Sequence, residues 1–571
     1  MAVNLEKKYK KGICYWYVSE KKRINGKVKR VFQKYLGSQE QCLARLLGKD
    51  SKEACFTEPP EVFQYGAVTV LLKIAEELGI MNIIDNYMQE QSDKDIRFYN
   101  PDNENLPSLG TYILLASINR CISSTSKRDM YNWFSNTSLK RHWDHLTPQN
   151  ISSQCFWNAM QTFTQRHLSD LSQLIIDRVF NLYKEIDRSC MLFDQTNYYT
   201  FIDTFNQRCT LAQRGANKQK RRNLRQVGYL LMVTKDSHIP VLHCCYEGNH
   251  NDITSFKDNL DQVISTAKRI TKESEITLIF DKGNVSGQVM QSIQKELHFV
   301  TSLPISDHDD LLKLQGPMEC ARVKTREQEE ILAFVTGKKL WGKQHKIVIG
   351  FSPSFYDAQS KSLYLQIEKA ERKLKEIQES LQRYYVNNQG KKPTIADIRS
   401  KVSKILKHDN LNQLIPHKIS GKRYIKLEFK IDEEKVQKYI ELFYGKTIHV
   451  TNRTEWTPLE IIQAYRDQST IENCIKETKG MKHSVWWPLG HWTDQKIHVH
   501  GFYTFIGLLL KSLVLKKLKE HGIDRCWHSI VTDLDNIHEV IELYSENAQI
   551  VPHIRLSKMN RQQKELLGAL L

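Results

Sequence analysis

Between residues 190 and 303, short apolar runs alternate with helical patterns, and this alternation constrains the fold more than any other feature of the chain. The runs lie at 190–193, 228–233, 241–245, 276–280 and 299–303. Strands that alternate with helices in this way are typical of an α/β sheet with helices packed on it. From 61 to 187 the apolar residues instead recur every three or four positions, which predicts a helical domain.

The segments outside these two regions have patterns of their own. Residues 1–60 contain apolar runs on either side of Asn25-Gly26, a dipeptide that favours a type I′ turn, so we predict a small β-hairpin module. Its basic strands suit contact with DNA, and they equally suit protection of an exposed sheet edge.

Residues 304–450 include a charged helix with a heptad seam, together with strand-like alternation. The seam consists of Leu363, Ile367, Ala370, Leu374, Ile377 and Leu381. It is short for a coiled-coil dimer, so an intramolecular helical hairpin is the favoured interpretation.

Two of the apolar runs end in an aspartate in the same way. Asp194 follows Met191-Leu192-Phe193, and Asp281 follows Leu278-Ile279-Phe280. A carboxylate at the end of a buried strand is costly to ionise unless a cation, hydrogen bonds or a proton compensates for it. The pattern therefore makes both aspartates candidate metal ligands, although an aspartate that caps the following turn has the same pattern.

A third carboxylate, Glu472, lies on a helix whose predicted start is Thr457-Pro458, where Thr457 and Glu460 form a capping box. At their spacing, four polar side chains share one face of this helix. They are Tyr465, Gln468, Glu472 and Lys479. A solvated helix side is the alternative interpretation, but three carboxylates suit phosphodiester cleavage, because acidic oxygens hold the two magnesium ions of such sites.

The face of this helix resembles a signature of the DDE transposases of bacterial insertion sequences, in the branch marked by Tyr-x2-Arg-x3-Glu-x6-Lys. Three of the four positions match at the family spacing, and Gln468 stands where the family has arginine. The resemblance covers most of the chain, in the family order. The other similar segments are Tyr35-Leu36-Gly37, 215–226 with Asn223 in place of aspartate, 247–252, Asp281-Lys282-Gly283, and a tail around His491-Trp492.

This resemblance implies an RNase H-like catalytic core, a mixed sheet with flanking helices, in which Asp194, Asp281 and Glu472 hold two divalent metal ions, magnesium or manganese. The core is expected in two parts, 188–303 and 451–571, with an insertion domain at 304–450. The implied activity is DNA transposition: cleavage at the terminal inverted repeats of an insertion sequence and joining to target DNA by a synaptic homodimer. Tyr465, Gln468 and Lys479 are expected to contact phosphates.

The charge balance favours a polyanionic partner. Lysine and arginine outnumber aspartate and glutamate by 83 to 65, for a net charge of +18, although basic proteins without such a partner exist. One basic stretch follows the first aspartate, and we predict that it holds DNA phosphates, with solvated surface as the alternative. Its residues are Lys218, Lys220, Arg221, Arg222 and Arg225.

Other features bear on the compartment and on base stacking. The 12 cysteines form no Cys-x-x-Cys pair, no signal peptide is evident, and the longest apolar run ends at Lys511, short of the roughly 20 residues of a membrane span. We therefore expect a cytoplasmic, nucleoid-associated bacterial protein without membrane contact. Trp341, Trp486 and Trp487 are candidates for stacking on an unpaired base, with core packing the more common role.

Two other functions remain open at this point. One is an RNase H-like nuclease without strand transfer. The other is a catalytically inactive, DNA-binding descendant of a transposase. The departures at Gln468 and Asn223 favour the inactive descendant, whereas retention of Asp194, Asp281 and Glu472 argues against it.

Overall fold

The computed structural model describes residues 3–10, 13–24, 27–39, 41–42, 59–91, 106–215, 221, 223–270, 275–314, 319–322, 329–390, 392–407, 410–421, 423–480, 482–483, 486–487, 489–542 and 553–571. The chain divides into two compact units. Unit 1 comprises Met1–Thr69, Phe134–Trp143 and Ser529–Gly568. Unit 2 comprises Val70–Trp133, Asp144–His528 and Ala569–Leu571. The five-part division expected from the sequence stays a prediction.

Unit 1 contains two antiparallel sheets. Strands β1 (Val3–Lys10), β2 (Ile13–Ile24) and β3 (Lys27–Ser38) form the first in the order β1-β2-β3. The predicted hairpin is therefore present as β2–β3 with a third strand added, while the expected turn residues Asn25 and Gly26 lie outside the described residues. The second sheet has the order β18-β17-β4, from β4 (Glu61–Gln64), β17 (His538–Glu542) and β18 (His553–Leu556).

Unit 2 contains a group of helices that pack on one another. They are α3 (Ile80–Glu90), α4 (Leu109–Ile122), α7 (Ser153–Met160), α8 (Gln165–Leu182) and α18 (Asp494–Glu520). All residues of α4 are buried, because α3 and α18 pack against it. Of the described helices, α18 alone is long and apolar enough to cross a membrane, and 94% of its most apolar window is buried within the structure, as in a core helix.

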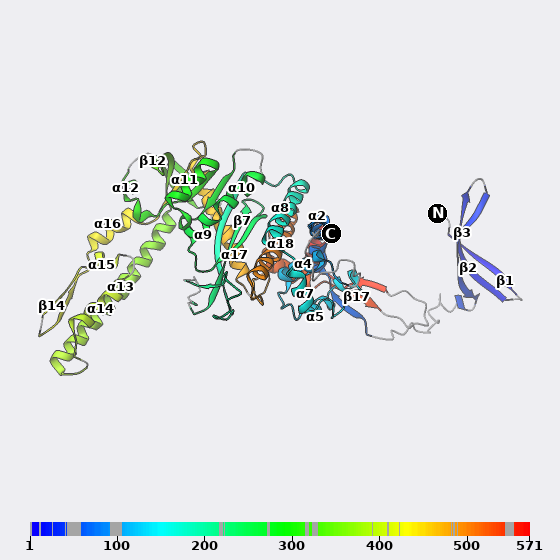
Figure 1. The fold of residues 1–571 in the computed structure, drawn as a ribbon, viewed down its shortest axis with the longest axis horizontal. Coiled ribbons are helices and arrows are strands. Elements are labelled where there is room, and N and C mark those ends of the chain that lie inside the picture. The colour runs from blue at the N-terminus through cyan, green and yellow to red at the C-terminus, as the bar shows by residue number, and fades with distance from the viewer. Residues whose placement is uncertain are drawn as a thin grey trace. The chain divides into compact units, whose positions relative to one another are not determined.

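A ten-stranded mixed sheet forms the centre of unit 2 (Figure 1). Its order is β11-β12-β13-β16-β10-β9-β5-β7-β6, with β8 also paired to β7. Strands β5, β9 and β10 are mutually parallel, and the other pairings are antiparallel. The bounds are β5 (Cys190–Thr200), β6 (Gln213–Arg214), β7 (Arg225–Thr234), β8 (Pro240–Glu247), β9 (Thr277–Phe280), β10 (His298–Ser302), β11 (Glu319–Arg322), β12 (Glu330–Leu340), β13 (Lys343–Phe351) and β16 (Lys446–Thr451).

Helices cover both faces of this sheet. On one face, Phe256 of α9 (Asp252–Asp258) packs against Phe193 of β5 and Phe280 of β9. On the other face, α17 (Pro458–Thr478) contacts β5, β9 and β10.

The segments that connect strands β8, β9, β10 and β11 contain further short helices. They include α10 (Leu260–Ile270), η1 (Lys282–Asn284), α11 (Gly287–Glu296), η2 (Ile305–Asp307) and α12 (Asp309–Leu312). Outside the insertion described below, the other described helices are α2 (Gly66–Leu78), α5 (Met130–Ser135), α6 (Leu139–His142), α19 (Trp527–Asp535) and α20 (Arg561–Leu570).

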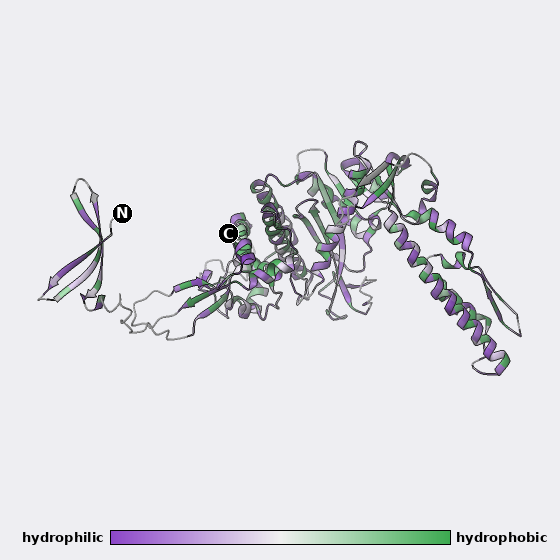
Figure 2. Ribbon diagram, turned by 180° about the vertical axis from the view of Figure 1, so that it is seen from behind, coloured by the Kyte–Doolittle hydropathy of each residue, from purple (hydrophilic) through white to green (hydrophobic). Residues whose placement is uncertain are grey.

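Between β13 and β16 the chain leaves the sheet and builds a separate hydrophobic core. This insertion contains α13 (Pro353–Asn387), α14 (Ile395–Ile405), α15 (Leu411–Leu414), β14 (His417–Ser420), β15 (Lys426–Phe429) and α16 (Glu433–Phe443). Figure 2 shows hydrophilic and hydrophobic residues interspersed along α13. The predicted heptad residues are its buried ones, and they pack within the same chain, so the intramolecular interpretation is confirmed.

Candidate carboxylate site

The two predicted aspartates follow paired residues on neighbouring parallel strands. In the β5–β9 pairing, Phe193 lies opposite Phe280, and Asp194 and Asp281 are the residues that follow them. Asp281 follows the end of β9 as predicted, but Asp194 lies within β5, which continues to Thr200, so the prediction that it ends its strand was wrong. Adjacent strands are about 4.8 Å apart, so this register brings the two backbone positions close together. Both aspartates are partly exposed. Oδ1 of Asp194 accepts a hydrogen bond from the backbone N–H of Gln195 at 2.8 Å.

Asp194 points to the face of the sheet that α17 covers. Phe193 packs on α9, and successive side chains of a strand point to opposite faces, which puts Asp194 on the side opposite α9. Tyr198 has the same parity as Asp194, and its hydroxyl contacts Oγ1 of Thr478 at the end of α17. The carboxylate of Asp194 therefore shares a face with the helix that carries Glu472.

Helix α17 is tied to both aspartate strands by side chains of the predicted signature. Its first turn has the capping box predicted for Thr457 and Glu460. The Tyr465 hydroxyl donates to Oδ1 of Asp281 at 2.8 Å, and Nε2 of Gln468 donates to the Phe193 carbonyl at 2.6 Å. Burial and the negative charge of Asp281 raise the pKa of Tyr465, so its phenol stays protonated and remains a donor.

Glu472 lies one helical turn beyond Gln468, on the same face of α17. Its side chain is 48% exposed, and Oε2 is 4.0 Å from Nζ of Lys476. Within the described part of the chain, no group of three or more His, Cys, Asp or Glu side chains is arranged to hold a metal ion. The structure thus places Asp194 and Asp281 side by side, with Glu472 on the helix bonded to both strands, but it does not join the three carboxylates into one cluster.

The chemistry of these carboxylate side chains nevertheless suits the expected metal ions. Carboxylate oxygens are hard ligands of the type that Mg²⁺ and Mn²⁺ prefer, and Asp194 and Asp281 supply them directly after paired residues of neighbouring strands. One oxygen of Asp281 is already bonded to Tyr465, and the other accepts the N–H of Gly283 at 3.4 Å. Asp281 is therefore also the turn-capping aspartate that its sequence pattern allowed.

A fourth carboxylate, Asp252, lies beside Asp281 and was not predicted as a site residue. A Cβ placed on Gly283 would lie 3.5 Å from Oδ2 of Asp281 and 3.8 Å from Oδ2 of Asp252. Burial raises the pKa of Tyr246, and the charges of Asp252 and Asp194 raise it further, so this tyrosine lies near both. The sequence signal was the Gly-Asn-x-x-Asp element, whose last residue starts α9.

The predicted phosphate-binding residues divide into several groups. Lys218, Lys220 and Arg222 lie outside the described residues. Arg221 is exposed, with its guanidinium carbon 4.5 Å from the ring centre of Tyr199. At the end of α17, Nζ of Lys479 is 5.8 Å from the ring centre of Tyr198. For Arg221, Lys479 and Tyr465, phosphate contact stays a prediction.

Arg225 and Gln468 require corrections. Arg225 is buried, with 7% of its surface exposed. Its guanidinium donates to the carbonyls of Asp203 at 2.8 Å, of Asn206 at 3.1 Å, of Cys209 and of Ala212. Gln468 is only 3% exposed, and its amide holds α17 to β5. Both side chains thus organise the interior of unit 2 instead of presenting donors to a phosphate.

The three candidate stacking tryptophans pack against protein. Trp486 is fully buried and stacks on Tyr198, with ring centres 4.4 Å apart. Trp487 donates its indole N–H to the Tyr199 carbonyl at 3.0 Å. Trp341 packs edge-on against Phe299. Core packing, the alternative given for these residues, describes their surroundings.

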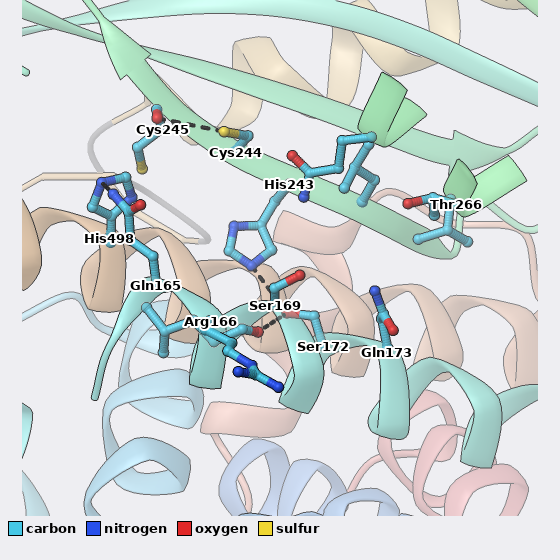
Figure 3. A pocket seen from close by; sticks show the side chains of 14 residues that line it. Gln165, Arg166, Ser169, Ser172, Gln173, His243, Cys244, Cys245, Thr266 and His498 are labelled. Carbon is cyan, nitrogen blue, oxygen red and sulfur yellow. Dashed lines mark hydrogen bonds between the residues drawn. The ribbon is translucent and has the colours of Figure 1, made fainter. Parts of the chain in front are cut away.

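A cavity of about 350 Å³ lies elsewhere in unit 2, between β8, α8, α10 and the start of α18. Figure 3 shows His243 and Ser172 meeting in it, with Oγ of Ser172 3.2 Å from Nε2 of His243. Burial lowers the pKa of His243 to about 3 and that of His498 to about 4, so both imidazoles are neutral at pH 7. The lining contains none of the predicted site residues.

The described residues define a mixed α/β protein with a large mixed sheet and many helices. No protein-family model and no curated protein matches the chain. Among solved structures, a cryo-EM structure of the piggyBac transposase synaptic complex with hairpin DNA aligns with 84% of this chain and 82% of that chain, at 8% identity and a TM-score of 0.37. A score this low does not establish a shared fold.

Proposed function

We propose that this protein is a DDE transposase, which cleaves the ends of an insertion sequence and joins them to target DNA. One observation carries the proposal. Phe193 and Phe280, which precede Asp194 and Asp281, pair across the parallel strands β5 and β9, and the helix that carries Glu472 is hydrogen-bonded to the Phe193 carbonyl and to Asp281. Two aspartates and a helix that are far apart in the sequence thus lie together, in the order that the family signature predicts.

The topology of the central strands supports an RNase H-like core. Along the sheet the order is β8-β7-β5-β9-β10. Strand β5 is antiparallel to β7, β7 is antiparallel to β8, and β5, β9 and β10 are parallel. An RNase H-like sheet has this order and these directions, with its first acidic residue on the central strand. The insertion leaves the sheet after β13 and returns as β16, outside these five strands.

In the proposed site, Asp194, Asp281 and Glu472 are the residues that would hold the divalent metal ions. Bound there, such ions supply activation of the attacking oxygen and stabilisation of the leaving oxygen. The chain's own contribution is positioning. Tyr465 fixes the orientation of the Asp281 carboxylate, and Gln468 fixes the register of α17 against β5.

We propose that the Glu472 side chain joins the two aspartates when the metal ions bind. Its carboxylate is half exposed, and its described ion-pair partner, Lys476, is 4.0 Å away and 70% exposed. An exposed pair of this kind contributes less than about 1 kcal/mol, so the attraction of a divalent cation readily exceeds it. Catalytic contacts are commonly longer before substrate and cofactor bind.

We propose DNA as the partner, both the terminal inverted repeats and the target, with a homodimer bringing two element ends together. The net charge of +18 supports a polyanionic partner. Magnesium, or manganese in its place, is proposed as the cofactor, and the bacterial cytoplasm as the compartment.

The test uses purified full-length protein, Mg²⁺ and duplexes that carry the terminal repeats read from the DNA flanking the coding sequence. A transposase produces a free 3′ hydroxyl at the element end and joins it to a supercoiled plasmid. Asp194→Asn and Asp281→Asn are expected to abolish both steps, whereas Asp397→Asn, on the exposed face of α14, retains them.

Other outcomes separate the alternatives. Cleavage without joining identifies a nuclease, and DNA binding without cleavage identifies an inactive descendant. Cleavage retained by a folded Asp194→Asn protein refutes the carboxylate assignment.

A further inference from the structure

A second cavity in unit 2, of about 450 Å³, is lined by aromatic and basic side chains. Its walls come from α7, from the loop after β5 and from the segment that leads into α18. The side chains that matter here are Trp157, Arg208, His491, Trp492 and Lys496. None of them belongs to the carboxylate site.

The charge of this cavity is positive. Arg208 and Lys496 line it, and no lining residue is acidic. The nearby carboxylate of Asp494 is engaged elsewhere: it accepts hydrogen bonds from the backbone N–H and hydroxyl of Thr210, at 3.0 and 2.6 Å, and from the N–H of Leu211 at 2.9 Å. The cavity therefore presents cations without a compensating acidic group in its lining.

The floor of the cavity is formed by a buried histidine. His491 is only 2% exposed, and its Nδ1 has no hydrogen-bond partner among the described residues. Its other nitrogen, Nε2, is 3.1 Å from the Tyr503 hydroxyl. Burial, together with the positive charges of Lys127, Arg120 and Lys496, keeps the pKa of His491 well below its usual value, so the imidazole is neutral.

A buried lysine lies behind this floor. Lys127 is 6% exposed, and in the described structure its Nζ has no hydrogen-bond partner. Its Nζ lies over aromatic faces, 4.4 Å from the ring centre of Phe156 and 4.5 Å from that of Tyr503. Burial and the charge of Arg120 lower the pKa of Lys127 well below its usual value, so the positive charge of the cavity rests on Arg208 and Lys496.

One exposed aromatic ring lines the cavity, and a second, Phe205, precedes the lining residue Asn206 in the sequence. Trp492 is 68% exposed, although its backbone is fixed by a 3.1 Å hydrogen bond from Asn206 to its carbonyl. Phe205, next to Asn206, is 90% exposed. Inside, Trp157 packs edge-on against His491 at 4.3 Å between ring centres. Large aromatic side chains left in water beside cations are typical of surfaces that stack nucleic-acid bases.

We propose that this cavity binds one nucleotide of an unpaired DNA strand. The base stacks on Trp492, and its phosphate is held by Arg208 and Lys496. This inference depends on the proposed function only for the identity of the strand as DNA. The binding chemistry, a ring to stack and an anion to neutralise, follows from the cavity itself.

The test measures binding without catalysis, in EDTA, by fluorescence anisotropy of a labelled five-nucleotide oligothymidylate and full-length protein. Trp492→Ala is expected to weaken binding about tenfold or more, the loss typical of one stacked base, and Trp492→Tyr to restore most of it. Arg208→Gln and Lys496→Gln should each lower the slope of log Kd against log salt by about 0.7. Unlabelled dTMP should compete, but at a higher concentration than the oligonucleotide.

Matched controls lie on the insertion helix α13, where Tyr364→Ala removes an aromatic ring that is 52% exposed and Lys375→Gln removes an exposed cation. Both should leave binding unchanged. Equal Kd values for wild type and all three cavity variants, or an equally Trp492-dependent affinity for a blunt hairpin duplex, would overturn the proposal. Loss of end cleavage in the metal-dependent assay, with this binding intact, would refute the transposase function alone.

Discussion

The Tyr465 hydroxyl donates a 2.8 Å hydrogen bond to Oδ1 of Asp281, across 184 residues of sequence. Tyr465→Phe removes this bond and leaves the ring in place. Because a hydrogen bond to a carboxylate contributes about 1.5–3 kcal/mol, we expect the free energy of unfolding to fall by that amount and metal-dependent cleavage to slow. Urea denaturation and the end-cleavage assay measure the two effects, and a variant unchanged in both would contradict the positioning role.

Gln468 stands where the family signature has arginine, and it is 3% exposed. Gln468→Arg therefore introduces a buried charge, which we expect to destabilise the free protein by several kcal/mol. Gln468→Leu is the matched control, because it removes the bond to Phe193 without introducing a charge, and leaving the Phe193 carbonyl without this donor should cost only about 1–3 kcal/mol. Equal midpoints of denaturation for the two variants would show that the helix tolerates arginine here.

Arg225 donates to four backbone carbonyls of the loop that follows β5. Arg225→Met keeps the aliphatic stem but leaves those acceptors without a donor, so we expect a loss of about 3 kcal/mol or more in stability. The salt dependence of DNA binding should not change, since the guanidinium is buried. A lowered salt slope with normal stability would restore the original phosphate-binding interpretation.

Gly248 is packed against backbone. A Cβ at this position would lie 1.8 Å from the carbonyl oxygen of Gln226, an overlap that only movement of a β-strand relieves. We expect Gly248→Ala to destabilise the protein by more than about 3 kcal/mol, in the range of severe packing defects. Gly287→Ala, where the added methyl group meets no neighbour within 4 Å, is the control. Comparable thermal midpoints for the two variants would contradict this packing.

Asp535 gives unit 1 a pH-dependent stability. Burial raises its pKa to about 7, from the ordinary value of 3.8. The unfolded chain then releases this proton near pH 4 and the folded chain near pH 7, so stability is greatest below pH 4 and falls as the pH rises through this window. Asp535→Asn should remove that fall and increase stability at pH 7.5 by on the order of 3 kcal/mol. Parallel pH profiles for wild type and variant would contradict the assignment.

The parts of the fold with a regular pattern could be predicted from the sequence. The run before Asp281 became β9, because buried parallel strands are continuous apolar segments, whereas the run before Asp194 is only the start of β5, which continues through polar residues to Thr200. The capping box at Thr457 marked the start of α17. Each of these signals lies within a few consecutive residues, so it can be interpreted without knowledge of contacts to distant parts of the chain.

Side-chain direction and distant partners could not be predicted in the same way. Helical spacing puts Gln468 and Glu472 on one face, but it does not reveal that the first is buried against Phe193 while the second is half exposed. Arg225 looked like part of a basic surface, since its four acceptors are carbonyls that carry no sequence signature. Asp252 approaches Asp281 only through the packing of α9 beside η1.

The insertion leaves and re-enters the sheet at one point. The backbone N–H of Ser352, at the end of β13, donates to the carbonyl of Gly445, just before β16, at 2.8 Å. The whole insertion is therefore connected to the sheet through two chain segments that are hydrogen-bonded to each other. A two-residue turn would satisfy the same strand ends. Evolution can lengthen, shorten or exchange that appendage without disturbing strand register, and an engineer looking for a place to graft a foreign module has the same freedom.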